Sequence, residues 1–557
     1  FVLDTLEDSA NFCSVFQVDA VTGEEYTYEK MRERSVRCAL WMRSQGLLPG
    51  DVVAICSHNQ LDVAMPCLAA LYLVIPRMRD FLHLINITRP KMAFVSEDSA
   101  TVLAEATKEV KFDVKIIVFG RVTGFLEFES VIAEPEVDYV KNFECTPIKN
   151  PRQTAMIISS SGTTGLPKCV VLSHEAIVEQ LLQSKKFGMA GSKCLMFSTL
   201  YWISGALWIF MELFWKVTKI ITPAFDEYSA WEIVEKFQVN CSIVWIHLGS
   251  SMINRLLKSD ALARYDLSRV TRVCYGGAPL ALTSREAFAK FVPNALITSA
   301  YGLTEVCGII SMQTAISKPR SSGQFIGNSQ LKVIDPDTGR TLGTNQIGEL
   351  LFKTTSMMSC YYGDPQATAE TLDEEGWLRS GDIGYYDENG EIYVLERSKE
   401  LIKSRGYKVS PFELETVIWS HPGVKEVAVV GSPHAEDGEH PVAFVVRATD
   451  STGAGKNVII SHHYGRMSIL IGIVEIFHRF LKMLRSLKWS WLTWWLPNYP
   501  TANDSVVVSS SLIIYQQHRL AKQYAGSYAS WQSLWQEVEE IDESTPYADL
   551  TLAWKGN

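Results

Sequence analysis

Ser159-Ser-Ser-Gly-Thr-Thr-Gly-Leu-Pro-Lys168 is the stretch that decides the fold, and it directly follows the apolar run Thr154-Ala-Met-Ile-Ile158. The short apolar run predicts a buried strand. The small residues after it let backbone N–H groups approach a phosphate chain, and the hydroxyls of Thr163 and Thr164 and the ammonium of Lys168 add donors and charge. A Walker loop would end in Gly-Lys-Ser/Thr, whereas here Cys169 follows Pro167 and Lys168. A flexible linker need not follow a buried strand or end in Pro-Lys, so the stretch predicts a phosphate-binding loop.

Outward from this loop, short apolar runs alternate with helical patterns from Thr27 to about Leu350. Such alternation predicts buried strands separated by helices, that is, an α/β layered protein. Turn-rich stretches at Asp335-Pro-Asp-Thr-Gly339 and Asp387-Glu-Asn-Gly390 predict hairpins in a β-rich section. We therefore expect a large N-terminal domain, residues 1–395, made of two βαβ layered subdomains plus a β-rich subdomain.

A small α+β C-terminal domain is expected from residue 396, where a strongly polar stretch gives way to the apolar run Val424 to Val430. This domain is predicted over residues 396–457 and ends in a linker rich in Gly, Ser, Thr and Asp. Residues 458–557 differ in character, since Lys488-Trp-Ser-Trp-Leu-Thr-Trp-Trp-Leu496 holds four tryptophans. We expect this tail to be divergent, and mispredicted or alternatively spliced sequence is the favoured explanation.

The overall composition excludes some classes of partner. The chain has 557 residues and a formal net charge of -10, which argues against a nucleic-acid footprint. No apolar run reaches the roughly 20 residues that a membrane span needs. The 11 cysteines form no CxxC pair and no metal-binding cluster, as is usual for reduced intracellular thiols. The expected location is therefore intracellular, either peroxisomal or cytoplasmic. The terminal Lys555-Gly556-Asn557 is not the Ser-Lys-Leu peroxisomal signal, so the sequence does not choose between the two.

Four further motifs follow the phosphate loop in order. They are Gly276-Gly-Ala-Pro-Leu280, Tyr301-Gly-Leu-Thr-Glu305, Ser380-Gly-Asp-Ile-Gly384 and Glu396-Arg-Ser-Lys-Glu-Leu-Ile-Lys-Ser-Arg-Gly-Tyr-Lys408. Together with the loop they resemble the acyl-adenylate-forming superfamily, and the chain is most similar to insect acyl-CoA synthetases, 4-coumarate-CoA ligases and luciferase-like enzymes. The resemblance implies activation of a fatty or aromatic carboxylic acid with ATP to an acyl-adenylate, and transfer of the acyl group to coenzyme A.

The same resemblance implies roles for individual residues. Lys168, Thr304, Glu305 and Arg397 would be catalytic, and Glu305 would hold Mg²⁺, a hard cation suited to carboxylate and phosphate oxygens. Gly277, Ala278, Tyr301 and Gly302 would line the adenine pocket, with Tyr301 stacking on the base. Thr304 would contact the α-phosphate, Asp382 would accept the ribose hydroxyls, and Arg397 would support the same sugar and phosphate. Trp202, Gly205 and Gly276 would line the acyl pocket, while Glu396, Lys403 and Gly406 would mark the hinge and the coenzyme A path. The implied ATP/AMP site comprises Ser160, Ser161, Gly162, Thr163, Thr164, Gly165, Lys168, Gly277, Ala278, Tyr301, Gly302, Leu303, Thr304, Asp382 and Arg397.

The chain departs from the family pattern in three places. Trp202 stands where the family commonly has a histidine, and Ile75-Pro-Arg-Met-Arg-Asp-Phe81 is shorter than the usual stretch. The C-terminal lysine motif of the family is not found, since Gly455-Lys456 comes too early and Lys482 and Lys488 lie in a different context. Loss of a charge aimed at the transition state costs on the order of 10²- to 10³-fold in rate.

Two alternatives to an acid–thiol ligase remain open. A luciferase-like monooxygenase would oxidise the adenylate with O₂ and emit light. A homologue without catalytic activity would bind ATP or AMP and release no pyrophosphate. The acyl substrate and the oligomeric state are not specified by the sequence.

Overall fold

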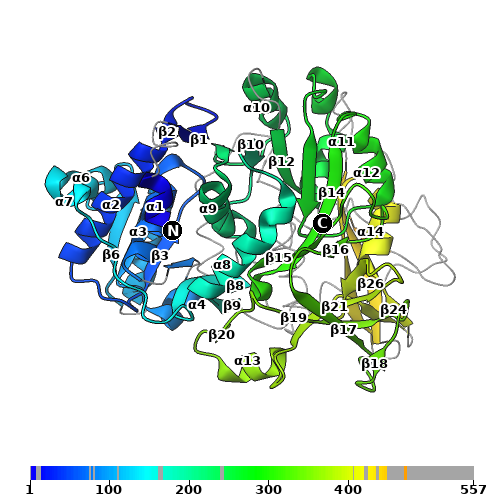
Figure 1. Ribbon diagram of the computed structural model, residues 1–557. Helices are drawn as coiled ribbons and strands as arrows, with labels where there is room; N and C mark the ends of the chain where they lie inside the picture. The colour runs from blue at the N-terminus through cyan, green and yellow to red at the C-terminus, as the bar shows by residue number, and fades with distance from the viewer. Residues whose placement is uncertain are drawn as a thin grey trace, which may run out of the picture. The chain divides into compact units, whose positions relative to one another are not determined.

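The computed structural model describes residues 2–7, 14–74, 77–79, 82–109, 112–160, 167–238, 244–404, 407–419, 424–434, 438–447 and 470–472. The chain divides into two compact units, Phe1–Ser398 and Lys399–Asn557. The first unit contains three sheets, with the helices packed on the two larger ones (Figure 1).

The eight-stranded sheet carries the phosphate loop. Its strands from β8 to β7 run parallel, whereas β9 and β20 are antiparallel additions at one edge. The shortened stretch at residues 75–81 still supplies β4, which lies between β3 and β8. In order the strands are β20 (Cys360–Tyr361), β9 (Lys168–Ser173), β8 (Thr154–Ser160), β4 (Arg77–Arg79), β3 (Val53–Cys56), β5 (Met92–Ser96), β6 (Lys115–Phe119) and β7 (Leu126–Glu127).

The nine-stranded sheet has a parallel centre from β1 to β14 and antiparallel edges. Its residues alternate between two cores, because successive side chains of a strand point to opposite faces. Ile246 and Leu248 pack with Trp231 and Phe288 on one face, and Cys274 packs with α9 on the other. In order the strands are β16 (Gln324–Phe325), β15 (Gly308–Met312), β14 (Leu296–Leu303), β13 (Arg272–Gly276), β12 (Val244–Gly249), β10 (Lys193–Met196), β11 (Thr218–Ile221), β1 (Val15–Asp19) and β2 (Glu25–Thr27).

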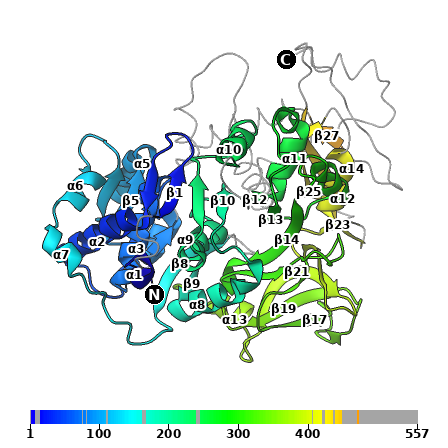
Figure 2. The same ribbon diagram turned by 45° about the horizontal axis from the view of Figure 1, so that its top comes forward.

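Helices cover both larger sheets, and α8 and α9 lie between them in both views (Figure 1, Figure 2). Their starts follow from the sequence: the Thr27 hydroxyl accepts from the Lys30 N–H at the start of α2, and the Ser173 hydroxyl accepts from the Ala176 N–H at the start of α8. The α-helices of this unit are α1 (Val2–Glu7), α2 (Tyr28–Ser44), α3 (Ala64–Tyr72), α4 (Leu82–Thr88), α5 (Glu97–Glu109), α6 (Phe128–Ala133), α7 (Val137–Lys141), α8 (His174–Gln183), α9 (Ile203–Trp215), α10 (Ser229–Gln238), α11 (Ser250–Lys258), α12 (Leu282–Ala289) and α13 (Pro365–Thr371). The 3₁₀ turns are η1 (Leu61–Val63), η2 (Ser184–Phe187), η3 (Ala261–Arg264) and η4 (Thr304–Val306).

The third sheet is antiparallel and contains both predicted hairpins, which join β17 to β18 and β21 to β22. This confirms the β-rich subdomain. Its strands, in order, are β18 (Thr341–Leu342), β17 (Ser329–Ile334), β19 (Gly348–Thr354), β21 (Leu378–Tyr386) and β22 (Ile392–Arg397).

The second unit is a small α+β structure, as predicted. Helix α14 (Pro411–Trp419) packs on its sheet through Ile418, which shares a core with Val429 and Ala443. The described strands are β23 (Ile402–Ser404), β24 (Tyr407–Val409), β25 (Val424–His434), β26 (Gly438–Arg447) and β27 (Leu470–Gly472). The tryptophan-rich stretch and Lys456, Lys482 and Lys488 lie outside the described residues.

Candidate active site

The phosphate loop connects two antiparallel strands. Ser160 ends β8 and Lys168 begins β9, and these two residues are paired across the ladder. Residues 161–166 are outside the described part of the chain, so the roles of Ser161, Gly162, Thr163, Thr164 and Gly165 stay predictions. The hairpin fixes where the loop leaves the sheet and where Lys168 enters it.

Lys168, Tyr361 and Glu305 lie together at this edge of the sheet. The Lys168 Nζ is 4.8 Å from the centre of the Tyr361 ring, and the Tyr361 hydroxyl donates to Glu305 Oε1 at 2.9 Å. Burial and the neighbouring Glu305 carboxylate raise the pKa of Tyr361, so its hydroxyl stays protonated and donates. Sequence reasoning identified Lys168 and Glu305 but missed Tyr361, which is separated from Glu305 by 56 positions.

Glu305 is presented by a short turn. It lies in η4, directly after β14, and its backbone carbonyl accepts from the Met358 N–H at 2.8 Å. Thr304 and Glu305 are both partly exposed. The turn therefore holds the predicted metal ligand and the predicted α-phosphate contact side by side.

Tyr301, Asp382 and Arg397 form a second cluster. Asp382 is buried, and its carboxylate accepts from the Tyr301 hydroxyl at 2.5 Å and pairs with Arg397 Nε at 2.9 Å. Burial and the Asp382 charge raise the pKa of Tyr301 well above its usual value. The structure thus joins three residues that the sequence assigned to adenine, ribose and phosphate.

The predicted adenine loop follows β13. Gly276 ends that strand, and the Ser250 hydroxyl donates to the Ala278 carbonyl at 2.6 Å. Gly277 has a φ of 86° and faces open space, which leaves its backbone accessible to a flat ring. On the neighbouring strand β14, a Cβ at Gly302 would lie 2.0 Å from the Gly308 carbonyl oxygen, so only glycine fits there. Leu303, next to it, is buried.

Two of the predicted acyl-pocket residues, Trp202 and Gly205, lie at the start of α9, and the third, Gly276, ends β13. Trp202 is the residue before the helix, is 37% exposed and contacts the Tyr201 ring edge-on at 4.9 Å. A Cβ at Gly205 would lie 2.0 Å from the Thr199 carbonyl oxygen. A Cβ at Gly276 would lie 2.5 Å from the Ala300 carbonyl oxygen. These two glycines allow close backbone packing.

His247 and Trp208 extend this region and were not identified from the sequence. Because Ile246 and Leu248 face the other core, His247 points to the α9 side of β12, with its ring 6.3 Å from that of Trp208. Gly249, two residues further on the same face, is paired with Gly276. Burial lowers the pKa of His247 to about 4, so its imidazole is neutral at pH 7.

The predicted hinge and coenzyme A residues fall in different units. Glu396 is buried in the first unit, beside Arg397. Lys403 lies in the second unit, where its backbone N–H donates to Glu439 at 2.7 Å. Gly406 is outside the described residues.

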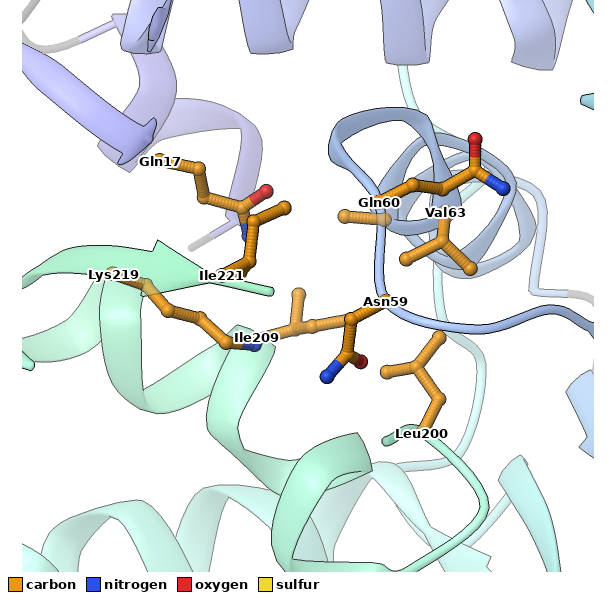
Figure 3. Close-up of a pocket in the computed structure, with 9 residues that line it drawn as sticks. Gln17, Asn59, Gln60, Val63, Leu200, Ile209, Lys219 and Ile221 are labelled. Carbon is orange, nitrogen blue, oxygen red and sulfur yellow. The ribbon is translucent and has the colours of Figure 1, made fainter. Parts of the chain in front are cut away.

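A separate cavity lies away from these clusters (Figure 3). Its volume is about 10 Å³, room for about one water molecule. Gln17, Asn59 and Lys219 supply its polar walls, with Leu200 and Ile209 among the apolar ones. It is too small for a nucleotide or an acid.

The residues present fit Mg²⁺ and ATP. Within the described ranges no group of three or more His, Cys, Asp or Glu side chains forms a self-contained metal site. Mg²⁺ bound with a nucleotide needs only one or two carboxylates, because phosphate oxygens and water complete its shell. Glu305, with one oxygen held by Tyr361 and Lys168 close by, is such a carboxylate. No described helix is long and apolar enough to cross a membrane.

Comparisons with known proteins show the family of this chain. Residues 10–362 match the AMP-binding enzyme family and residues 413–471 match the AMP-binding enzyme C-terminal domain, so the second match runs past Asn457. The chain is 32% identical to luciferin 4-monooxygenase of Luciola mingrelica, over 79% of this chain and 83% of that protein. It is 31% identical to 4-coumarate–CoA ligase 3 of Oryza sativa subsp. japonica, over 78% of this chain and 80% of that protein. The solved luciferase-like enzyme of the nonluminescent mealworm Zophobas morio is 29% identical, with a TM-score of 0.66, covering 72% of this chain and 95% of that one. The chain belongs to the AMP-binding enzyme family.

Proposed function

We propose that this protein activates a carboxylic acid with ATP and transfers the acyl group to coenzyme A. The observation that carries the proposal is the pair of clusters in the first unit, Lys168–Tyr361–Glu305 and Tyr301–Asp382–Arg397. One suits a polyphosphate with its cation, and the other suits a nucleoside.

In the first step the substrate carboxylate attacks the α-phosphorus, a new P–O bond forms, and the bond to pyrophosphate breaks. Lys168 and Thr304 would bind phosphate oxygens as charge develops on them, and positioned charges of this kind are worth about 10²- to 10³-fold in rate. Mg²⁺, held by Glu305, would neutralise phosphate charge. In the second step the coenzyme A thiol attacks the acyl carbon, a C–S bond forms, and AMP leaves with the C–O electron pair. Lys403 and Gly406 are proposed to lie along the thiol's path, and Glu396 at the hinge.

The proposed acid is fatty or aromatic. Trp202, Trp208 and His247 support a flat aromatic acid, because aromatic faces pack well against a planar ring. A neutral, half-buried imidazole also offers a hydrogen bond to a polar substituent on such a ring.

The deciding experiment is acid-dependent ATP–pyrophosphate exchange, with Mg²⁺ and a panel of fatty and aromatic acids. Exchange that needs an acid and falls about 10²-fold or more in Lys168→Ala would support the proposal. AMP binding without exchange by the wild-type protein would contradict it and favour a non-catalytic homologue.

A luciferase-like monooxygenase is the second candidate, favoured by the identity to luciferin 4-monooxygenase. Light on addition of luciferin and ATP would support it. Peroxisomal or cytoplasmic location is also proposed, since the chain is 30% identical to peroxisomal OPC-8:0-CoA ligase 1 of Arabidopsis thaliana. Imaging of the tagged full chain tests the compartment.

A further inference from the structure

Tyr361 lies between two oppositely charged residues of the candidate site. Its ring faces the Lys168 ammonium, with 4.8 Å from Nζ to the ring centre, and its hydroxyl holds Glu305 Oε1 at 2.9 Å. The side chain is 4% exposed, so its position is set by protein atoms rather than by solvent. Among the described residues, no ion pair joins Lys168 directly to Glu305.

The backbone of Tyr361 is fixed on both sides. Strand β20 pairs with β9, which places Tyr361 opposite Val170, on the strand that begins at Lys168. The Tyr361 N–H donates to Thr368 Oγ1 at 2.9 Å, and the Tyr362 N–H donates to the Cys169 carbonyl at 2.7 Å. These contacts fix the backbone of Tyr361 between β9 and α13, and the burial of its side chain restricts the ring to this site.

The position of Tyr361 separates two side chains of opposite charge. A lysine and a glutamate at one site attract each other, and a direct pair would occupy the groups that a nucleotide and its cation need. A tyrosine between them satisfies both weakly, through a cation–π contact and one neutral-donor hydrogen bond. Within the described residues, no other hydrogen bond occupies the second Glu305 oxygen or the three Lys168 N–H donors, which suit a cation and a phosphate.

We propose that Tyr361 is a positioning residue, which orients the Glu305 carboxylate for the nucleotide-bound Mg²⁺ and keeps Lys168 from pairing with it. This inference rests on the proposed function, because it assigns Tyr361 to the same nucleotide site. It does not require that the acid be known.

The test measures ATP binding by calorimetry, with and without Mg²⁺, in the full chain. Tyr361→Phe keeps the ring and removes the hydroxyl. We expect the gain in ATP affinity that Mg²⁺ gives to shrink about 5- to 10-fold, with Mg²⁺-free ATP binding unchanged. Tyr361→Leu removes the ring as well, so Mg²⁺-free ATP binding should also weaken about 2- to 5-fold. Tyr362→Phe, the same change one residue away on an exposed side chain, is the matched control and should behave as wild type.

A double-mutant cycle with Glu305→Gln separates positioning from general damage. If Tyr361 acts through Glu305, Tyr361→Phe should change the Mg²⁺ response no further in the Glu305→Gln background. An unchanged Mg²⁺ response in Tyr361→Phe, or an equal effect in both backgrounds, would overturn the inference. Absence of acid-dependent exchange in the wild type would refute the proposed reaction, yet leave this binding test intact.

Discussion

Asp382 accepts from the Tyr301 hydroxyl and pairs with Arg397 while it remains almost fully buried. A carboxylate is a two-oxygen acceptor with about four lone-pair sites, a group suited to accepting from the hydroxyls of a ribose. Its two neighbours also fix its orientation before any nucleotide arrives. In the proposed function this carboxylate would be preorganised for a sugar, and its charge is balanced by Arg397.

Asp382→Asn is expected to weaken AMP binding about 10- to 100-fold, because an amide replaces charge-assisted acceptors. The variant should also lose the wild-type preference for AMP over 2′-deoxy-AMP, and calorimetry with both nucleotides measures this. Asp387→Asn is the matched control, since Asp387 pairs with Lys318 at the hairpin turn instead. Equal discrimination by Asp382→Asn and wild type would contradict a ribose contact.

Much of the element-level structure could be predicted from local sequence. The runs at Lys115–Phe119 and Thr154–Ile158 are strands, and both turn-rich stretches are hairpins, because period and turn residues are local signals. The ordered motifs also led to the Tyr301–Asp382–Arg397 cluster. Tyr361 and His247 escaped prediction because their partners come from strand pairing and helix packing between distant segments.

A hydrogen bond connects the loop after β13 to helix α11. The Ser250 hydroxyl, at the start of α11, donates to the Ala278 carbonyl. Ser250→Ala should loosen residues 276–278 and weaken AMP binding about 3- to 10-fold, the worth of one hydrogen bond. Pyrophosphate binding should be unaffected, since it does not use the base. Competition measurements with AMP and with pyrophosphate distinguish the two, and equal weakening would argue against a role in the adenine loop.

His247 on strand β12 is expected to make the stability of the fold depend on pH. The pKa of His247 is about 4 in the folded protein and about 6.5 when the residue is free. Below pH 6.5 the unfolded chain therefore binds a proton that the folded chain resists, so stability falls as pH drops from 6.5 towards 4, by up to about 3 kcal/mol. His247→Phe should show a shallower loss of melting temperature over this window. Parallel melting curves for the variant and wild type would contradict the assignment.

At the scale of the whole first unit, a buried ion pair ties together segments that are far apart in sequence. Lys219 on β11 and Glu212 on α9 lie 3.0 Å apart and are almost fully buried, and Gln17 on β1 donates to Glu212 at 2.8 Å. Burial raises the pKa of Glu212, opposed by the Lys219 charge. The nearby cavity of Figure 3 is lined by Lys219 and Gln17. The pair thus joins the N-terminal strand to the centre of the unit.

Lys219→Met should destabilise the protein by about 3–5 kcal/mol, because Glu212 is left buried and unpaired. Replacing both residues by methionine should recover most of this loss, since no unpaired charge remains. Thermal denaturation of the single and double variants measures the difference. A double variant no more stable than Lys219→Met would show that the ion pair is not the cause.

The close approach of the paired strands β14 and β15 at Gly302 has a consequence for mutational screening. With the Gly308 carbonyl 2.0 Å from where a Cβ would sit, even alanine forces the two strands apart. In a saturation library sorted for correctly folded protein, almost all recovered sequences should encode glycine at position 302. Codon 277, whose residue faces open space, should retain asparagine and aspartate, the side chains that tolerate its backbone angle. Deep sequencing of one unselected and one sorted pool would therefore locate the close approach of β14 and β15 without any assay of activity.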